Sequence, residues 1–428
     1  MNSPSVIVLV NLNAYLGGGE TLMVRFAKYL QAKGCEFICV CAHGGYAHAD
    51  LQRNGIEPDS ILPIESSPDY FYAGRAGRRH LVNLIVSRIR SRPARFVSFC
   101  MRDLYTVRAV CTRVPLATIV HLILHIQDDL YLGQTILEKI GYRLTGRLRF
   151  GSFKAINFNR RLLNEVNENG GLICMAELIA NAWHQSFGIV IPSNRIIPLP
   201  SFIEIPERAA QEENNRKILW IGRLVDFKIP ALLAMVDFLA STNDYRLTVV
   251  GAGDRTAFIA RMKERDLAPD RVNFVGEVPY AQLGEIISGH SIGYAMGTSL
   301  IELAKFQIPV VIALASYTHA PFSRPICGGL FFDQPRGCDG SELSMRSESE
   351  IETTIADAIG TIETDWKRVS RACYEYARNN YSLEQNFSEY ENVIDNAACI
   401  SYAEKPIAIP KAPLFRKIIY SLSNRWGK

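Results

Sequence analysis

The sequence predicts an α/β protein with two doubly wound domains, each a parallel sheet covered by helices, that face each other across a cleft. Three observations lead to this prediction. Short β-branched runs alternate with helical patterns, which is typical of parallel sheets. The composition turns polar and charged near residues 203–217, as in a linker. The alternation then begins again. We therefore expect domains at residues 1–204 and 217–395, a linker at 205–216 and a tail at 396–428.

In the first domain, a glycine turn separates the first predicted strand from a helix. That helix has apolar residues at helical spacing, among them Leu22, Phe26 and Leu30. The strands predicted in this domain are SVIVLVNL (5–12), EFICVCA (36–42), RFVSFC (95–100) and LATIVHLI (116–123).

The second domain repeats the pattern with shorter connections. A helix is expected through ALLAMVDFLA (231–240) and another through LGEII (283–287). The predicted strands are KILWIGRL (217–224), RLTVVGAG (246–253), VNFVG (272–276), SIGYAM (291–296) and IPVVIA (308–313). Ligands of such sheets bind beyond the carboxyl ends of the strands, so two facing sheets are expected to share one cleft.

Length and composition are those of a cytoplasmic globular protein. The chain has 428 residues, 48% of them hydrophobic, which is enough for two full cores. No uncharged apolar run reaches the roughly 18 to 20 residues that span a bilayer, and the N-terminus lacks the basic region of a signal peptide. The ten cysteines form no framework, and CEFICVC (35–41) alternates like a strand, so free thiols are expected and no metal site.

Positive charge is concentrated in one part of the chain. Residues 75–161 contain 17 Lys and Arg but four acidic residues, whereas the whole chain has a net charge of +4. Such a basic belt predicts an anionic partner, here the surface of a membrane; a solvated basic surface is the alternative. Because no nucleic-acid-binding motif accompanies it, nucleic acid is not expected. The tail has a basic, amphipathic pattern that fits either a membrane surface or the protein itself.

Four glycine-containing turns follow predicted strands. In the first, Gly18 and Gly19 open a helix, where backbone N–H groups can approach a phosphate or sugar; a plain tight turn is the alternative. In the second, Gly222 precedes Arg223 and Lys228, two cations that could neutralise a diphosphate or simply occupy an exposed loop.

The third turn contains Gly251 and Gly253. It begins like a dinucleotide-binding loop but has Thr256 at the third glycine position, which favours a simple strand–helix turn. Glu277, directly after VNFVG, is a further candidate ligand at a strand end.

The fourth turn, Gly297-Thr298-Ser299, opens a helix that contains Glu302. The spacing of Ser299 and Glu302 fits a capping box, in which each side chain bonds the other's backbone N–H. It also fits a nucleotide site, with phosphate at the helix start and a ribose hydroxyl on the glutamate. The stretch alone favours the capping box, but four ligand-type loops at four strand ends favour a ligand site.

These motifs together resemble the glycosyltransferases of the GT-B fold, which consists of two Rossmann-like domains. The chain is most similar to the large retaining group called glycosyltransferase family 4. The family's G-G-x-E helix start resembles GGGE (17–20), its G-R-x-x-x-x-K loop resembles residues 222–228, and its v-G-x-G and V-x-F-x-G runs resemble VVGAG and VNFVG. Its L-E-A-x-x-x-x-x-P-V-I-A stretch resembles residues 301–313. The likeness is clear over residues 217–313 and 6–41.

The resemblance implies a role for each matching residue. Glu302 would bind the ribose hydroxyls of a nucleotide-diphosphate sugar, and Thr298 and Ser299 would meet its phosphate. Arg223 and Lys228 would stabilise the diphosphate leaving group in place of a metal, so no cofactor is expected.

A family histidine at the end of an N-domain strand corresponds to His121 by its distance from Pro115. His125 fits better as a polar strand end. For each of them a buried structural histidine is the alternative.

Two positions depart from the family pattern. The family has two glutamates separated by seven residues, but Tyr294 stands eight positions before Glu302, so the first glutamate is missing. Ile229 replaces the glycine that usually follows the lysine. The first departure puts the donor sugar, and also activity, in question.

The sequence therefore predicts a glycosyltransferase acting on a glycan acceptor, lipid-linked, at the inner face of a membrane, in surface polysaccharide or lipopolysaccharide synthesis. The alternatives are a catalytically inactive sugar- or nucleotide-binding protein of the same fold and a sugar-nucleotide epimerase. A nicotinamide-dependent oxidoreductase is a further alternative, suggested by GAGDRT (251–256).

Overall fold

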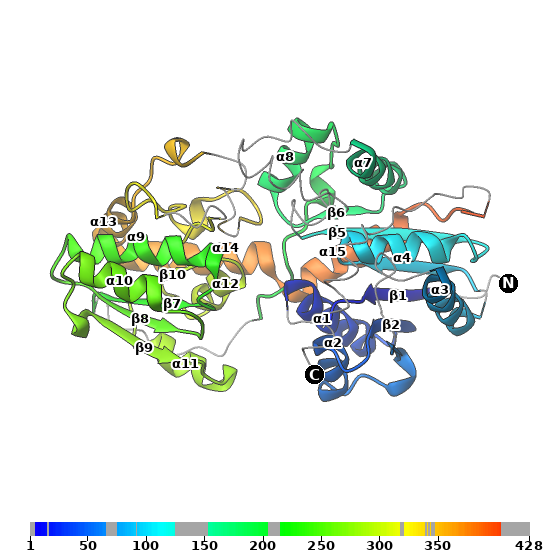
Figure 1. Ribbon diagram of the computed structural model, residues 1–428, viewed down its shortest axis with the longest axis horizontal. Helices are drawn as coiled ribbons and strands as arrows, with labels where there is room; N and C mark the ends of the chain where they lie inside the picture. Colours follow the sequence, from blue (N-terminus) through cyan, green and yellow to red (C-terminus); the bar gives the residue numbers. More distant parts are fainter. Residues whose placement is uncertain are drawn as a thin grey trace. The chain divides into compact units, whose positions relative to one another are not determined.

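The computed structural model divides into two compact units, each with its own parallel sheet (Figure 1). The first unit contains residues up to Met175, Ile179–Ile197 and the chain from Phe387 on; the second contains Ala176–Leu178 and Pro198–Asn386. The structure describes residues 5–14, 17–65, 75–90, 92–124, 153–203, 215–316, 321–338, 340, 343 and 347–403.

The first unit is a six-stranded parallel sheet in the order β3-β2-β1-β4-β5-β6. Its strands are β1 (Val6–Asn11), β2 (Phe37–Ala42), β3 (Ile61–Ile64), β4 (Ala94–Ser98), β5 (Ala117–Ile123) and β6 (Leu172–Cys174). Its helices are α1 (Gly18–Ala32), α2 (Tyr46–Arg53), α3 (Arg75–Ile89), α4 (Met101–Cys111), α7 (Phe153–Glu168) and α8 (Glu177–Phe187), the last of which begins in the second unit.

Every residue of β1, β2 and β5 is buried, which is why these strands read as continuous apolar runs. The strand order reverses between β1 and β4: β2 and β3 lie on one side of β1, and β5 and β6 lie beyond β4. The loops after β1 and β4 therefore flank the topological switch point of this sheet.

Helix α15 (Leu383–Asn396) belongs to the first unit from Phe387 onward. The Phe387 ring stacks on Phe26 of α1 with centroids 4.9 Å apart, and the Tyr29 hydroxyl donates to the Glu391 carboxylate at 2.7 Å. Aromatic stacking and a charge-assisted hydrogen bond thus attach this C-terminal segment to α1.

The second unit is a five-stranded parallel sheet in the order β11-β10-β7-β8-β9. Its strands are β7 (Lys217–Ile221), β8 (Arg246–Val250), β9 (Val272–Gly276), β10 (Ile292–Ala295) and β11 (Val310–Ile312). Its helices are α9 (Ile229–Ala240), α10 (Thr256–Glu264), α11 (Tyr280–Ser288), α12 (Thr298–Ala304), α13 (Ile355–Thr364) and α14 (Trp366–Tyr381). Here the order reverses between β7 and β10.

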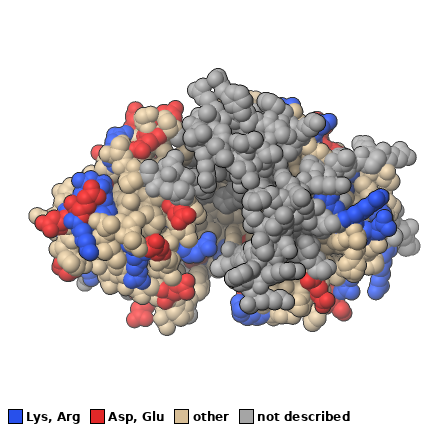
Figure 2. Space-filling view, viewed as in Figure 1, with Lys and Arg blue, Asp and Glu red and all other residues tan. Residues whose placement is uncertain are grey.

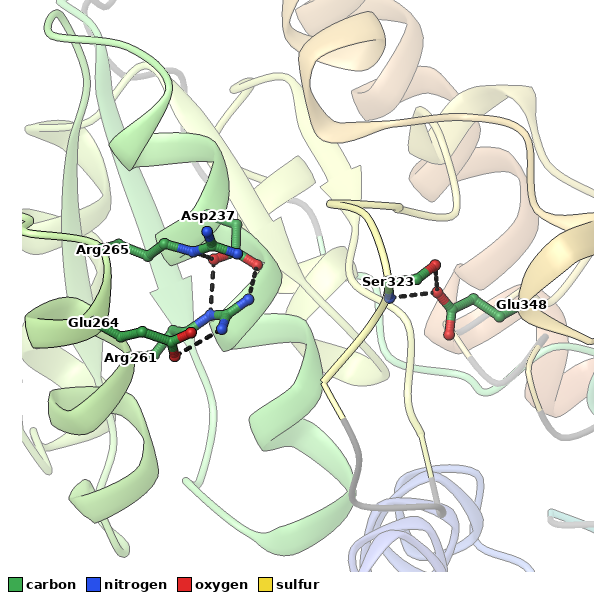
Figure 3. Close-up of polar contacts among 6 residues, drawn as sticks. All are labelled: Asp237, Arg261, Glu264, Arg265, Ser323 and Glu348. Atoms are coloured by element: carbon green, nitrogen blue, oxygen red, sulfur yellow. Dashed lines mark hydrogen bonds and ion pairs between the residues drawn. The ribbon is translucent and has the colours of Figure 1, made fainter.

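The core of this unit lies between the sheet and its helices. Trp220 of β7 and Tyr294 of β10 are fully buried, with ring centroids 5.7 Å apart. Ion pairs fasten α9 to α10 on the outside: Asp237 accepts two bonds from Arg261, each 2.8 Å or shorter, and one from Arg265 at 2.7 Å (Figure 3). These charges fix the two helices relative to each other.

All strands expected from the sequence are present, and the prediction of two doubly wound parallel domains is confirmed. In the described part of the chain, no helix is both long and apolar enough to cross a membrane. Within the same residues, no three His, Cys, Asp or Glu side chains are grouped as a metal site requires. Burial raises the pKa of the Cys41 and Cys373 thiols to about 12, which keeps them protonated and unreactive at neutral pH.

Candidate functional site

The carboxyl ends of the second unit's strands bring together the turns singled out in the sequence. Because all five strands run parallel, the residues that follow them lie along one edge of the sheet. Gly222 and Arg223 follow β7, Gly251 and Gly253 follow β8, Glu277 follows β9, and Gly297, Thr298 and Ser299 follow β10. The turns after β7 and β10, which are neighbours in the sheet, border its switch point.

The turns after β7 and β8 are held together by backbone hydrogen bonds that continue the ladder. The Gly222 amide donates to Val250 at 2.9 Å, and the Leu224 amide donates to Ala252 at 2.8 Å. A Cβ on Gly251 would lie 2.1 Å from the Gly222 carbonyl oxygen, and one on Gly253 would lie 2.1 Å from that of Leu224. These two glycines are therefore required by the close approach of the two loops.

The two cations of the β7 loop lie at its start and its end. Arg223 is exposed at the end of the strand. Lys228 closes a 3₁₀ turn (Asp226–Lys228) before α9, and its ammonium would be only 3.1 Å from a Cβ on Gly222. The chain thus folds back so that Lys228 reaches the residue preceding Arg223, and glycine at position 222 leaves room for the ammonium. Ile229, the departure from the family pattern, is the first residue of α9.

The turn after β10 is short and depends on one glycine. Gly297 has φ +64° and ψ −144°, a conformation that side-chain-bearing residues rarely adopt. Helix α12 begins immediately afterwards at Thr298 with Gly297 as its N-cap, and no side chain caps it. The capping-box interpretation is therefore wrong, because the helix starts at Thr298, two residues before the start that would make Ser299 its N-cap.

The carboxylate of Glu302 has two other partners. Its Oε2 lies 2.7 Å from the Lys305 ammonium, one turn further along α12, and accepts a hydrogen bond from the Tyr280 hydroxyl at 2.9 Å. Glu302 and Lys305 are buried, at 9% and 4% exposure. The pairing of Glu302 with Lys305 has a local signal, an acid and a base three positions apart on a helix, whereas Tyr280 lies on α11 and had none.

Tyr294 is not a member of this site. It lies inside β10, fully buried, and its hydroxyl donates to the Ala231 carbonyl at 3.0 Å. Burial raises the pKa of this phenol well above its usual value, so it remains protonated. The position of the family's first glutamate thus lies within a buried strand of this chain and is occupied by a core tyrosine.

Of the candidate residues of the first unit, Gly18 and Gly19 follow β1 at the switch point of its sheet. Gly18 is the first residue of α1 after β1, and a Cβ on Gly19 would lie 3.3 Å from the Asn11 side-chain amide. His121 lies in β5, fully buried, with its Nδ1 2.9 Å from the Ser98 hydroxyl, an arrangement that matches the structural alternative. His125 and residues 404–428 of the predicted tail lie outside the described residues.

Comparison with known proteins places the fold. No protein-family model and no curated protein matches the sequence. Among solved structures, the chain is similar to sucrose-phosphate synthase from Thermosynechococcus elongatus, at 14% identity and a TM-score of 0.57 over 92% of this chain and 98% of that one.

Two further solved structures are similar over their whole length. HepE from Anabaena in complex with UDP-glucose matches at 13% identity and a TM-score of 0.55, over 91% of this chain and 99% of HepE. The lipopolysaccharide outer core galactosyltransferase WaaB matches at 13% identity and a TM-score of 0.55, over 92% of this chain and 100% of WaaB. Together with the two parallel-sheet domains, these similarities show that the chain has the GT-B fold of these glycosyltransferases.

Proposed function

We propose that this protein is a glycosyltransferase that moves a sugar from a nucleotide-diphosphate sugar to a hydroxyl of a glycan acceptor, as part of surface polysaccharide or lipopolysaccharide synthesis. One observation carries the proposal: Gly222-Arg223 and Gly297-Thr298-Ser299 border the β7/β10 switch point, and Glu302 follows on α12. Switch points are where doubly wound sheets bind nucleotides. HepE, of the same fold, was crystallised with UDP-glucose.

The proposed transfer reaction requires groups that stabilise the leaving diphosphate. The acceptor oxygen forms a bond to the anomeric carbon, the bond from that carbon to the diphosphate breaks, and the proton of the acceptor hydroxyl passes to an oxygen of the departing diphosphate. Negative charge develops on the departing diphosphate. Arg223 can bind two of its oxygens in a fork and Lys228 supplies a point charge, so both act where charge appears in the transition state. Retention of anomeric configuration follows from the resemblance to family 4.

The test uses the full chain and a panel of UDP-, GDP-, ADP- and TDP-sugars. The donor is the one that raises the melting temperature most, since a ligand that binds only the folded state stabilises it. With that donor, Arg223→Ala should lose about 2 to 4 kcal/mol of transition-state stabilisation, measured in kcat/KM. Arg246→Ala is the matched control, because Arg246 is an exposed arginine at the opposite, amino end of β8. Equal kinetics for the two variants would contradict the leaving-group role.

A second candidate is a sugar- or nucleotide-binding protein without catalysis. It is favoured by the buried Tyr294, which occupies the position of the family's first glutamate and leaves the site without that carboxylate. Release of nucleoside diphosphate from the selected donor separates the two candidates. A transferase releases it slowly even without acceptor, whereas a binding protein shows saturable affinity and no release.

For the acceptor we propose a lipid-linked glycan at an anionic membrane surface. Helix α3 supports this choice, because Arg75, Arg79 and His80 are exposed on it, and Figure 2 shows Lys and Arg side chains gathered in its region. Basic residues near an anionic leaflet contribute about 1 kcal/mol each. Arg75→Gln/Arg79→Gln should therefore reduce sedimentation with phosphatidylglycerol vesicles, whereas Arg246→Gln/Arg368→Gln in the second unit should not. Equal binding by both pairs would contradict the placement.

A further inference from the structure

Tyr280 connects two helices that follow distant strands of the second sheet. It is the first residue of α11, after β9, whereas Glu302 lies on α12, after β10, and these strands are three places apart in the sheet. Its hydroxyl nevertheless donates to Glu302 Oε2 at 2.9 Å and lies 3.4 Å from the Lys305 ammonium. The contact therefore reaches across the sheet to the element that carries the proposed ribose ligand.

The two ends of the Tyr280 side chain have different surroundings. Its hydroxyl contacts a buried ion pair, yet the residue as a whole is 70% exposed. A hydrogen bond to a charged acceptor is stronger than one between neutral groups, and a tyrosine has only two side-chain torsions to fix. Single exposed aromatic residues are common on protein surfaces, but this one is held at its polar end by a hydrogen bond to a buried carboxylate.

We infer that the Tyr280 ring is the platform on which the base of the donor nucleotide stacks. The inference rests on the proposed function, in which Glu302 binds the ribose hydroxyls. In a nucleotide the base is attached to the ribose carbon next to the one that bears the 2′-hydroxyl. A ring fixed by its hydroxyl to the ribose-binding carboxylate is therefore within reach of the base.

The expected orientation of the bound nucleotide agrees with a base subsite at Tyr280. The diphosphate would meet Arg223 and Gly297 at the switch point, and the base leaves the ribose away from the phosphates. Tyr280 approaches Glu302 from α11, an element separate from both phosphate-binding turns. Stacking is tolerant of base identity because every base has a π face, so Tyr280 provides affinity for nucleotides in general.

A purely structural role would give a different pattern of variants. If Tyr280 only braces Glu302 and Lys305, then Tyr280→Phe and Tyr280→Leu are equivalent, because both remove the hydroxyl. If the ring stacks on the base, Phe keeps the platform and Leu removes it. Pyrophosphate has no base and therefore probes the phosphate subsite alone. If the ring acts by stacking, neither substitution should change the affinity for pyrophosphate.

The experiment measures binding of UDP, GDP, ADP and pyrophosphate to the full chain by calorimetry. For the tightest-binding nucleotide, Tyr280→Leu should weaken binding about 5- to 100-fold, the scale for losing one base–aromatic stack, whereas Tyr280→Phe should stay within about 3-fold of the original chain. Pyrophosphate affinity should be unchanged. Ile259→Ala, at an exposed apolar residue of α10, is the control, and melting temperatures without ligand verify folding.

Unchanged nucleotide affinity in Tyr280→Leu would overturn the inference and leave the proposed function standing. Equal losses in the Phe and Leu variants, accompanied by weaker pyrophosphate binding, would overturn it in favour of the bracing role. Failure of the original chain to bind any of the three nucleotides would overturn the proposed function, and this inference with it.

Discussion

The ammonium of Lys305, the residue that ends α12 as its C-cap, lies 2.7 Å from the carboxylate of Glu302 on that helix, and both side chains are buried. A buried ion pair adds little net stability, because desolvation offsets most of the attraction. Its larger consequence is geometric. The pair fixes the direction of the carboxylate that we propose binds ribose.

Removing one partner of this pair should destabilise the second unit strongly. Lys305→Met removes the cation beside the buried carboxylate and keeps the hydrogen bond from the Tyr280 hydroxyl. We expect the free energy of unfolding to fall by about 3 kcal/mol, at the lower end for a broken buried pair. The double variant Glu302→Gln/Lys305→Met should cost clearly less than the sum of the two single changes. Chemical denaturation of the four proteins measures this coupling, and strictly additive effects would show that the two groups do not interact.

Gly251 should not tolerate even the smallest side chain. Its φ is +138°, and a Cβ would lie 2.1 Å from the Gly222 carbonyl oxygen. Gly251→Ala should therefore displace the β7 loop and lower the free energy of unfolding by about 2 kcal/mol or more. Gly360→Ala is the control, since Gly360 lies within α13 with nothing inside 4 Å of the added atom, and it should stabilise by about 0.5 to 1 kcal/mol. Similar stabilities for the two variants would contradict the packing of the loops.

Stability should fall as the pH drops through the titration of His290. Its ring nitrogens lie 2.7 Å from the Ile286 carbonyl and 2.7 Å from the Thr248 hydroxyl, and burial lowers the pKa of the imidazole below its usual value of about 6.5. The unfolded chain therefore binds the proton first. The contribution is complete above about pH 6.5 and is lost as the pH falls through the lower native pKa.

His290→Asn tests this account, because asparagine does not titrate. Between about pH 7 and about pH 5 the original chain should lose more unfolding free energy than the variant does. Chemical denaturation at several pH values gives both slopes, and parallel slopes would show that His290 does not titrate differently in the two states.

Helix α15 should be essential to the first unit. Phe387 is fully buried and stacks on Phe26, so Phe387→Ala should cost about 3 to 5 kcal/mol, the range for removing a buried phenyl ring. The adjacent Ser388 is exposed, and Ser388→Ala should change stability by no more than about 0.5 kcal/mol. A small effect of Phe387→Ala in denaturation of the full chain would contradict the docking of this segment on α1.

Local patterns predicted every strand of the second sheet and four strands of the first, with the turns that follow them, but not the short edge strands β3 and β6. Continuous apolar runs predicted buried parallel strands. In the turns, Gly222, Gly251 and Gly297 each have a positive φ, which favours glycine. Which strands become neighbours is not a local property. β7 and β10 are not consecutive in the sequence, so it could not be predicted that the turns after them lie side by side. Their proximity follows from the order of the strands in the sheet.

The contacts within the candidate site were less predictable. The capping box failed because Gly297, with its positive φ, is the N-cap, two residues before the expected N-cap Ser299. The Tyr280 hydrogen bond joins residues 22 positions apart on separate helices, and no periodicity indicates such a pair. Likewise, nothing in the polar sequence of α15 indicated that its residues from Phe387 on belong to the first unit.

The most direct test of the proposed nucleotide site is a crystal structure of the full chain with the nucleoside diphosphate that it binds most tightly. We predict diphosphate oxygens at the turns after β7 and β10, contacting Arg223 or Lys228, with the ribose hydroxyls on the Glu302 carboxylate. A nucleotide bound elsewhere on the chain, with these turns and Glu302 unoccupied, would contradict the account.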